Sequence, residues 1–348
     1  MTDRLVDIAN KMVADGRGIL AADESTGTIK KRFDSIGVES TQDTRRAYRE
    51  MLFRSAEAMR ECISGVILFD ETLRQSAEDG TPFVELLAAV DSIPGIKVDK
   101  GAKSQPGFDR ETVTEGLDSL PDRLAEYHEL GARFAKWRAV IGISDTLPNW
   151  GNVRANAHAL ARYAACCQAA GIVPIVEPEV LMDGDPGDHT IDRCAEVTGD
   201  TLDVVFAELK EARIDLEGII LKPNMVIDGH KRRAGGPGAS VEEVAEKTVR
   251  TLKTHVPSIV PGIAFLSGGQ SDIEATAHLN AMNAGHSTPF ALTFSYGRAL
   301  QASALSAWKG QGANVAAASD AFAHRARMNR LAALGEWSPE REEDRRAA

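Results

Sequence analysis

A short strand-like unit occurs eight times along this chain of 348 residues, and this repetition restricts the fold more than any other feature of the sequence. Each unit follows a stretch of helical character, often through a glycine, and runs through a few apolar residues into polar ones. The eight units are GRGILAADES (16–25), CISGVILFDE (62–71), IPGIKVDKG (93–101), GARFAKWRA (131–139), AGIVPIVEPE (170–179), EGIILKPN (217–224), VPGIAFLSGG (260–269) and PFALTFSYG (289–297).

The segments between the units have helical periodicity, as in ANAHALARYAACCQ (155–168) and VEEVAEKTVRTLKTHV (241–256). Strands that alternate with helices pair in parallel, and eight such units close a (β/α)8 TIM barrel. An open doubly wound sheet is the competing α/β arrangement. No linker interrupts the chain, so we predict a single domain over residues 1–339 with an N-terminal helix and a C-terminal helical region. A short, charged, disordered tail is expected over 340–348.

Composition removes several classes of protein. The net charge is −11, which argues against a partner that is a nucleic acid, and 26% charged residues are typical of a soluble globular protein. The N-terminus, MTDRLVDIANKMVADGRG, has no long apolar core, so we expect neither a signal peptide nor a membrane span. Four cysteines without a CxxC pair indicate reduced thiols in a cytoplasmic protein, and the histidine spacing gives no support for a metal site.

Charged side chains gather at the carboxyl-terminal ends of the units, where a barrel carries its active face. They are Asp23, Lys100, Lys136, Arg138, Glu177, Glu179, Lys222 and Arg298. Residues two apart on a strand share a face. We therefore expect the side chains of Lys136 and Arg138 in AKWR to point the same way, and likewise those of Glu177 and Glu179 in EPE. Taken singly, each charge suits a solvated loop or, for Asp23, a helix N-cap. Charges inside a barrel mouth must instead pair or bind a ligand, since isolated burial is costly.

Lys222 is the most informative of these charges, because it directly follows the apolar run 219–221 and precedes a proline. A neutral lysine amine can attack a ketone and form an iminium, which withdraws electrons from the neighbouring carbon–carbon bond. Desolvation and a nearby cation both favour the neutral amine, and Lys136 is a candidate cation. Glu177, Glu179 and Asp23 are candidates for proton transfer. This set of residues predicts a carbon–carbon lyase that works through a Schiff base.

Two glycine-containing loops predict a phosphate site. LSGGQS (266–271) follows the seventh strand and FSYGR (294–298) ends the eighth, where barrels commonly bind phosphate through backbone N–H groups. The expected ligands are Ser267, Gly268, Gly269, Ser295, Gly297 and Arg298. A second cationic group is expected to hold another phosphate, and it comprises Ser25, Thr28, Arg32, Lys100 and Arg138. The substrate would then carry a phosphate at both ends.

The motifs together resemble those of class I fructose-bisphosphate aldolases. They are GILAADESTGTIKKR, GVILFDETL, GIKVDKG, FAKWR, IVPIVEPE, LKPNMV, FLSGGQS and ALTFSYGRALQ, in register from about residue 10 to GEWSP near 339. The resemblance implies a (β/α)8 barrel that reversibly cleaves fructose 1,6-bisphosphate to dihydroxyacetone phosphate and glyceraldehyde 3-phosphate without a metal or cofactor. It also implies a homo-oligomer, since members of the family are commonly homotetramers.

The resemblance further implies a role for each motif residue. Lys222 is similar to the Schiff-base lysine, and Glu177, with Glu179 beside it, to the proton acceptor for iminium formation. Asp23 is similar to the aspartate that takes the C4 hydroxyl proton as the bond breaks. Lys136 and Arg138 resemble groups that stabilise intermediates and anchor substrate. SGG and SYGR match the ketone-side phosphate site, whereas Ser25, Thr28, Arg32 and Lys100 fall where the family holds the distal phosphate.

The tail departs from the family pattern. Animal members end in a tyrosine that helps to exchange a proton on the carbanion, but this chain has no aromatic residue after Trp337. We therefore expect another group to protonate the enamine, or the step to be slow. Three other functions stay open from the sequence: a Schiff-base aldolase acting on a sugar monophosphate, a metal-dependent aldolase, and a non-catalytic scaffold on an aldolase fold.

Overall fold

Eight parallel strands pair side by side into a closed barrel in the computed structural model, which describes residues 2–184, 187–236 and 238–343. The order around the barrel is β1–β10–β9–β8–β7–β6–β3–β2. The strands are β1 (Gly18–Ala22), β2 (Ile63–Leu68), β3 (Ile93–Lys97), β6 (Phe134–Ile141), β7 (Val173–Val180), β8 (Ile220–Leu221), β9 (Gly262–Phe265) and β10 (Ala291–Tyr296). Each overlaps one of the eight units, although β6 and β7 extend slightly beyond theirs, so the prediction of a TIM barrel is confirmed and the open sheet is excluded.

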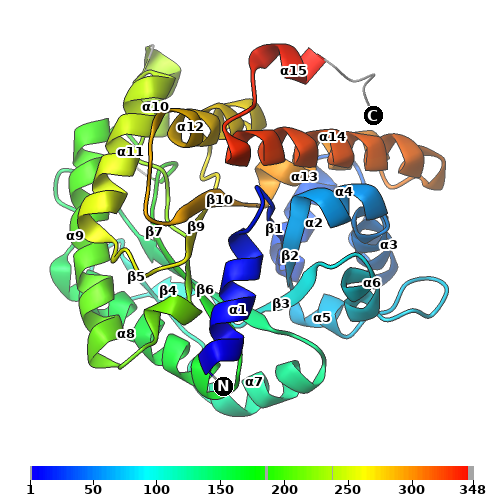
Figure 1. Cartoon of the computed structure of the whole chain (residues 1–348), viewed down its shortest axis with the longest axis horizontal. Coiled ribbons are helices and arrows are strands. Elements are labelled where there is room, and N and C mark those ends of the chain that lie inside the picture. The colour runs from blue at the N-terminus through cyan, green and yellow to red at the C-terminus, as the bar shows by residue number, and fades with distance from the viewer. Residues whose placement is uncertain (1, 185–186, 237, 344–348) are drawn as a thin grey trace.

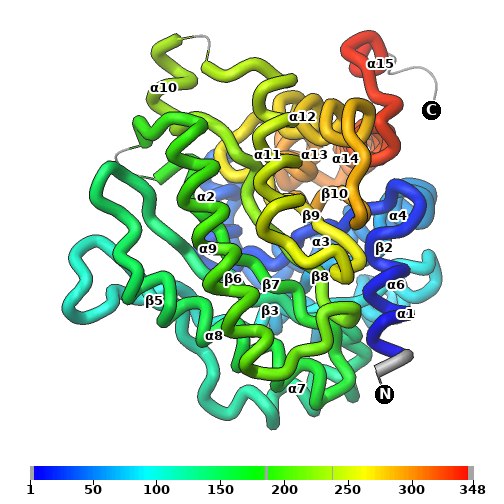
Figure 2. Tube along the Cα trace, turned by 60° about the vertical axis from the view of Figure 1, so that its left-hand side comes forward, coloured from blue at the N-terminus to red at the C-terminus, as the bar shows by residue number. Residues whose placement is uncertain are grey.

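The helices surround the barrel (Figures 1 and 2). Around the outside, α8, α9, α11, α12 and α14 contact one another in that order. The helices are α2 (Thr26–Asp34), α3 (Gln42–Phe53), α4 (Ala56–Cys62), α5 (Asp70–Leu73), α6 (Phe83–Ala89), α7 (Leu120–Glu129), α8 (Trp150–Ala169), α9 (Ile191–Glu211), α10 (His230–Gly235), α11 (Val241–His255), α12 (Asp272–Gly285), α13 (Arg298–Trp308) and α14 (Val315–Leu334). No helix in the described ranges is long and apolar enough to cross a membrane.

Alternation along the strands separates two cores. Outward side chains pack on the helices, as Trp137 does on Tyr163 of α8, with ring centroids 5.6 Å apart. Inward side chains form a smaller core inside the barrel, where the Phe134 ring fills the space above Gly95. A Cβ on Gly95 would lie 2.3 Å from this ring, so only glycine leaves room for it. Trp137, which lies between Lys136 and Arg138 in the sequence, thus belongs to the outer core.

The N-terminal helix closes one end of the barrel. Leu5, Ala9 and Met12 of α1 (Thr2–Val13) join the inner core, which includes residues from the beginnings of the strands. Figure 1 shows α1 crossing the middle of the barrel. Because apolar side chains fill this end, charged inward groups are expected at the carboxyl ends of the strands.

The inward rows of the strands change from apolar to charged along their length. On β6 the row is Phe134, Lys136 and Arg138, and on β7 it runs from Val173 to Glu177 and Glu179. The strands pair in register, with Arg138 beside Glu177. Strand β8 is short, but the Lys222 N–H still donates to Val176 O at 2.8 Å and extends the sheet to this lysine. The register therefore brings the predicted charges to one end.

The C-terminal segment differs from the expectation of a disordered tail. Residues Pro339–Glu343 form helix α15, shown at the red end of the chain in Figure 1. Trp337 Nε1 donates to Glu342 Oε1 at 2.8 Å, and the buried Arg325 of α14 donates to the same oxygen at 2.5 Å. These contacts order residues 340–343, and residues 344–348 lie outside the described part of the chain.

Candidate active site

A cavity of about 1030 Å³ opens at the carboxyl ends of the barrel strands. All of the predicted site residues line it, although they come from seven separate segments of the sequence. These residues are Asp23, Ser25, Thr28, Arg32, Lys100, Lys136, Arg138, Glu177, Glu179, Lys222, Ser267, Gly268, Gly269, Ser295, Gly297 and Arg298. The tertiary structure thus brings together the candidate acids, bases and phosphate ligands.

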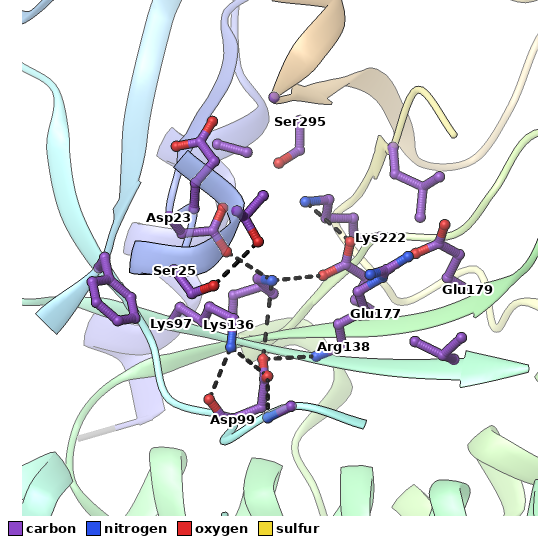
Figure 3. Close-up of a pocket in the computed structure, with 18 of the residues that line it drawn as sticks. Asp23, Ser25, Lys97, Asp99, Lys136, Arg138, Glu177, Glu179, Lys222 and Ser295 are labelled. Atoms are coloured by element: carbon purple, nitrogen blue, oxygen red, sulfur yellow. Dashed lines mark hydrogen bonds and ion pairs between the residues drawn. The ribbon is translucent and has the colours of Figure 1, made fainter. Parts of the chain in front are cut away.

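Glu177 lies between two lysines in this cavity (Figure 3). Lys222 Nζ is 3.2 Å from its Oε1, and Lys136 Nζ is 3.3 Å from its Oε2. All three residues are buried, with exposed fractions of 3 to 4%. Burial raises the pKa of Glu177, but the charges of Lys136, Lys222 and Arg138 outweigh it, so the pKa lies below its ordinary value. The carboxylate is therefore available to accept a proton beside Lys222.

Lys136 is surrounded by three carboxylates. Its Nζ lies 2.8 Å from Asp23, 3.3 Å from Glu177 and 4.0 Å from Asp99. Burial lowers the pKa of Lys136, but these anions outweigh burial and raise the pKa well above its ordinary value. Lys136 therefore stays cationic at neutral pH. Sequence reasoning placed a cation across from Lys222, and the structure places Glu177 between the two lysines.

Asp23 is ionised in this setting. Burial alone would raise the pKa of its carboxyl, but Lys136 and Lys222 hold the pKa far below the ordinary range. Asp23 directly follows β1, and its carboxylate lies beside the Lys136 ammonium in the cavity (Figure 3). The residue in the N-cap position, directly before α2, is Ser25 and not Asp23. The structure thus excludes the N-cap explanation for Asp23.

Arg138 and Glu179 form an ion pair with each other. The attraction of Glu179 raises the pKa of Arg138 further above its ordinary value, so the guanidinium is permanently charged. The two were predicted to have separate roles, one in anchoring substrate and the other in proton transfer. Because Glu179 neutralises Arg138 and does not contact Lys222, the arrangement favours a single function for the pair, namely to orient Arg138 at the cavity wall.

Sequence reasoning missed a pair of neighbouring charges in the cavity. Lys97 and Asp99 lie on and just after β3, where Lys97 Nζ donates to the carboxylate and to the carbonyl O of Asp99. Asp99 in turn lies near Lys136 and accepts from the Arg138 N–H at 3.4 Å. The signal was present, because these residues are two apart in GIKVDKG, as are the pairs in AKWR and EPE.

The loops after β9 and β10 have the geometry expected of an anion site. Gly268 and Gly269 have positive φ angles of 35° and 71°, and a Cβ on either would collide with Met182 or Asp183. These glycines therefore bring backbone close to the cavity wall. The Ser295 Oγ is buried and has no hydrogen-bond partner among the described residues. A polar atom of this kind calls for a ligand group.

The second predicted phosphate set is arranged around α2. Ser25 Oγ and Thr28 Oγ1 lie 3.1 Å apart at the start of this helix, and Lys100 is exposed at the cavity rim. Arg32 donates to Glu24, a residue that sequence reasoning missed. A Cβ on Gly297 would lie 3.5 Å from Arg32 Nη2, so this guanidinium also borders the β10 loop. The two predicted phosphate sets therefore meet at Arg32.

Among the residues that the structure describes, no group of three or more His, Cys, Asp or Glu side chains is arranged to hold a metal ion.

Comparison with known proteins assigns the chain to one family. The family described as fructose-bisphosphate aldolase class-I matches residues 4–348. A probable fructose-bisphosphate aldolase class 1 of Xanthomonas campestris pv. campestris is 54% identical over 336 residues, which is 96% of this chain and 98% of that protein. Fructose-bisphosphate aldolase C of Rattus norvegicus is 52% identical over 334 residues, which is 96% of this chain and 90% of that protein.

A solved structure agrees with this result. A fructose-bisphosphate aldolase from Plasmodium falciparum, crystallised with TRAP and a small-molecule inhibitor, superimposes with a TM-score of 0.93 and 49% sequence identity. The match covers 97% of this chain and 95% of that structure. The likeness therefore extends over the barrel, the outer helices and the segments that line the cavity.

Proposed function

This chain belongs to the class I fructose-bisphosphate aldolase family and is a carbon–carbon lyase, and we propose that Lys222 is the residue that forms its Schiff base. The reaction is the reversible cleavage of fructose 1,6-bisphosphate to dihydroxyacetone phosphate and glyceraldehyde 3-phosphate. The assignment depends on one observation, the 3.2 Å distance between Lys222 Nζ and Glu177 Oε1. Both residues line a cavity that is also lined by the loops after β9 and β10.

Bond formation requires Lys222 as the neutral amine. Its nitrogen attacks the C2 ketone of the open-chain sugar and gives a carbinolamine. Glu177 takes one proton from the Lys222 ammonium to free this amine, and a second proton moves from the nitrogen to the C2 oxygen as the carbinolamine forms. Glu177 then returns its proton to the C2 hydroxyl, which leaves as water when the iminium forms. Both oxygens of Glu177 have a lysine partner, so the carboxylate is held close to the reacting atoms throughout.

Bond cleavage uses the iminium as an electron sink. The C3–C4 electrons move toward the iminium nitrogen as the C4 hydroxyl loses its proton to Asp23, which releases glyceraldehyde 3-phosphate and leaves an enamine. Lys136 lies 2.8 Å from Asp23 and keeps this carboxylate ionised until then. Protonation of the enamine at C3 and hydrolysis of the iminium then release dihydroxyacetone phosphate and restore Lys222.

The two phosphates would bind to two different sets of residues that line the cavity. The backbone of Gly268 and Gly269, with Ser267, Ser295, Gly297 and Arg298, suits the phosphate next to the ketone. Ser25, Thr28, Lys100 and Arg32 suit the phosphate at the other end. A double anion site favours the bisphosphate over the alternative substrate, a sugar monophosphate. Initial rates with fructose 1,6-bisphosphate and fructose 1-phosphate would measure this preference.

Borohydride trapping tests the proposal. Reduction in the presence of dihydroxyacetone phosphate should fix the adduct on one peptide, and mass mapping should place it on Lys222. Sodium chloride in place of the sugar phosphate is the matched blank. Labelling of another lysine would refute the role of Lys222, and a protein that cleaves fructose 1,6-bisphosphate without any labelling would refute the Schiff base.

A homotetramer in the cytoplasm is the remaining part of the proposal. Family membership supports the tetramer, and four unpaired cysteines, Cys62, Cys166, Cys167 and Cys194, suit a reducing compartment. Sedimentation velocity at micromolar concentration should give a particle of four times the 37.4 kDa chain mass. A monomer or dimer under these conditions would refute the tetramer. Fractionation of the source cells would test the compartment.

A further inference from the structure

Buried Glu24 binds two arginines, one on each carboxylate oxygen. Arg32 of α2 donates to Oε1, and Arg49 Nη2 of α3 donates to Oε2 at 2.6 Å. The side chains of Glu24 and Arg49 are only 4% and 3% exposed, whereas that of Arg32 is 24% exposed and borders the cavity. Glu24 thus connects a cavity residue to an arginine that does not line the cavity.

The same carboxylate is fixed from a third side. Gln301 of α13 donates through Nε2 to Glu24 Oε1 at 3.0 Å and to Ala21 O of β1 at 2.8 Å. Tyr48 donates its hydroxyl to Gln301 Oε1 at 3.2 Å. Glu24 is consequently held in place whether or not Arg32 remains bonded to it.

The charges of this cluster do not cancel. Two guanidinium groups face one carboxylate, so Arg32, Glu24 and Arg49 together carry one positive charge, whereas Arg32 and Glu24 without Arg49 would be neutral. The Arg49 Nε and Nη1 atoms are buried and contact no acceptor among the described residues. A buried cation with unused donors is destabilising, so its presence calls for a role other than stability.

We infer that Arg49 is a positioning residue for phosphate binding, because it neutralises Glu24 and thereby allows Arg32 to transfer from Glu24 to a substrate phosphate. The inference rests on the proposed function, in which Arg32 is one of the phosphate ligands. With Arg49 in place, Glu24 keeps a charged partner after Arg32 leaves. Without it, transfer of Arg32 would abandon a buried, uncompensated carboxylate, and Arg32 would stay on Glu24.

Variants at two positions test the inference. Arg49→Met should raise the KM for fructose 1,6-bisphosphate and the Kd for inorganic phosphate by about tenfold or more, while kcat changes by less than about threefold. The double variant Glu24→Gln/Arg49→Met removes the anion that retains Arg32, so both constants should return toward the wild-type values. Arg49→Lys preserves the charge and should lie nearer to wild type than Arg49→Met.

A matched control is available on the same helix. Arg46 of α3 pairs with Glu50 at 2.6 Å and lines no part of the cavity, so Arg46→Gln should leave KM, kcat and phosphate binding unchanged. Thermal unfolding identifies any variant that does not fold. If Arg49→Met does not fold, the double variant and Arg49→Lys still test the inference. A charge effect predicts phosphate binding close to that of the wild type in both variants, whereas a packing effect predicts weak binding in the double variant.

Two results would overturn the inference. One is unchanged phosphate affinity in folded Arg49→Met, and the other is a double variant that binds phosphate as weakly as Arg49→Met, which would indicate a purely structural arginine. Phosphate binding by titration calorimetry needs no turnover. A wild-type protein that binds phosphate through Arg49-dependent contacts but cleaves no fructose 1,6-bisphosphate would therefore refute the proposed function and leave the inference standing.

Discussion

Glu177 Oε1 lies 3.2 Å from Lys222 Nζ, within reach for proton transfer to and from the nitrogen that is proposed to bond to the substrate. The residues are adjacent in space because β7 and β8 are neighbours, although the two positions are far apart in the sequence. Lys222 is the proposed nucleophile and Glu177 is the group that moves protons, so substitution of each residue should give a different defect.

Replacement of the nucleophile should remove all covalent chemistry. Lys222→Met should lower kcat by at least about 10⁴-fold and abolish borohydride labelling, because the other lysine beside Glu177, Lys136, is kept cationic by its carboxylate neighbours and cannot act as the nucleophile. Steady-state assays and mass mapping measure both effects. Lys253→Met, at an exposed lysine of α11, is the control and should behave as wild type. Substantial cleavage by Lys222→Met would contradict the prediction.

Glu177→Gln should slow the proton transfers without removing the nucleophile. We expect kcat to fall by about 10²- to 10⁴-fold, the usual contribution of general acid–base catalysis. Single-turnover trapping with borohydride should show slower but complete labelling of Lys222. Glu208→Gln, in an exposed pair with His158, is the control. Labelling at the wild-type rate would show that Glu177 has no part in iminium formation.

Asp23→Asn should separate bond cleavage from bond formation. The amide cannot accept the C4 proton, so cleavage of fructose 1,6-bisphosphate should fall by about 10²-fold or more. Dihydroxyacetone phosphate needs no C4 proton transfer to form its iminium, and it should still label Lys222. Rapid-quench kinetics would distinguish the two steps. Equal loss of labelling and cleavage would assign Asp23 to the earlier step.

Loss of the central cation should give a pH-dependent loss of stability. Lys136→Met leaves buried Asp23 and Glu177 without their main partner and should lower the free energy of unfolding by about 3 to 5 kcal/mol at pH 7. In the wild type both carboxyls have a lowered pKa in the folded state, so their stabilisation is present above the unfolded values of 3.8 and 4.5. It is lost progressively as the pH falls from these values through the lower folded-state pKa values.

The difference in the free energy of unfolding between Lys136→Met and wild type should consequently narrow as the pH falls from 7 to about 2, with the change beginning near pH 4.5. Urea unfolding at several pH values measures it. Lys247→Met, whose partners are mostly exposed, should show a small difference at every pH. A constant difference across this range would mean that Lys136 contributes through packing and not through charge.

Truncation of the tail should have little effect on turnover. The chain has no tyrosine in this region, and helix α15 is held by Arg325 and Trp337. A stop after Glu343 removes residues 344–348 and should change kcat by less than about twofold, since no group of the tyrosine type is lost. A stop after Trp337 also removes Glu342 and should lower the thermal midpoint, because buried Arg325 loses a partner at 2.5 Å. A large loss of turnover in the protein that ends at Glu343 would contradict the prediction.

The sequence by itself determined the barrel, because helix periodicity, glycines and apolar runs are local properties that recur eight times. It also determined which residues lie at the mouth, since side chains alternate along a strand and the polar ones follow the apolar ones. Alternation would have identified Lys97 and Asp99 as well, had it been applied to GIKVDKG.

Only the tertiary structure decided which charges are partners. Glu177 lies between Lys136 and Lys222, Glu179 pairs with Arg138, and Glu24 binds Arg32. These contacts depend on strand register and on the distance between side chains from separate elements. Because an ion pair within a few ångströms sets the protonation of a buried group, chemistry that the sequence could suggest became specific only after folding.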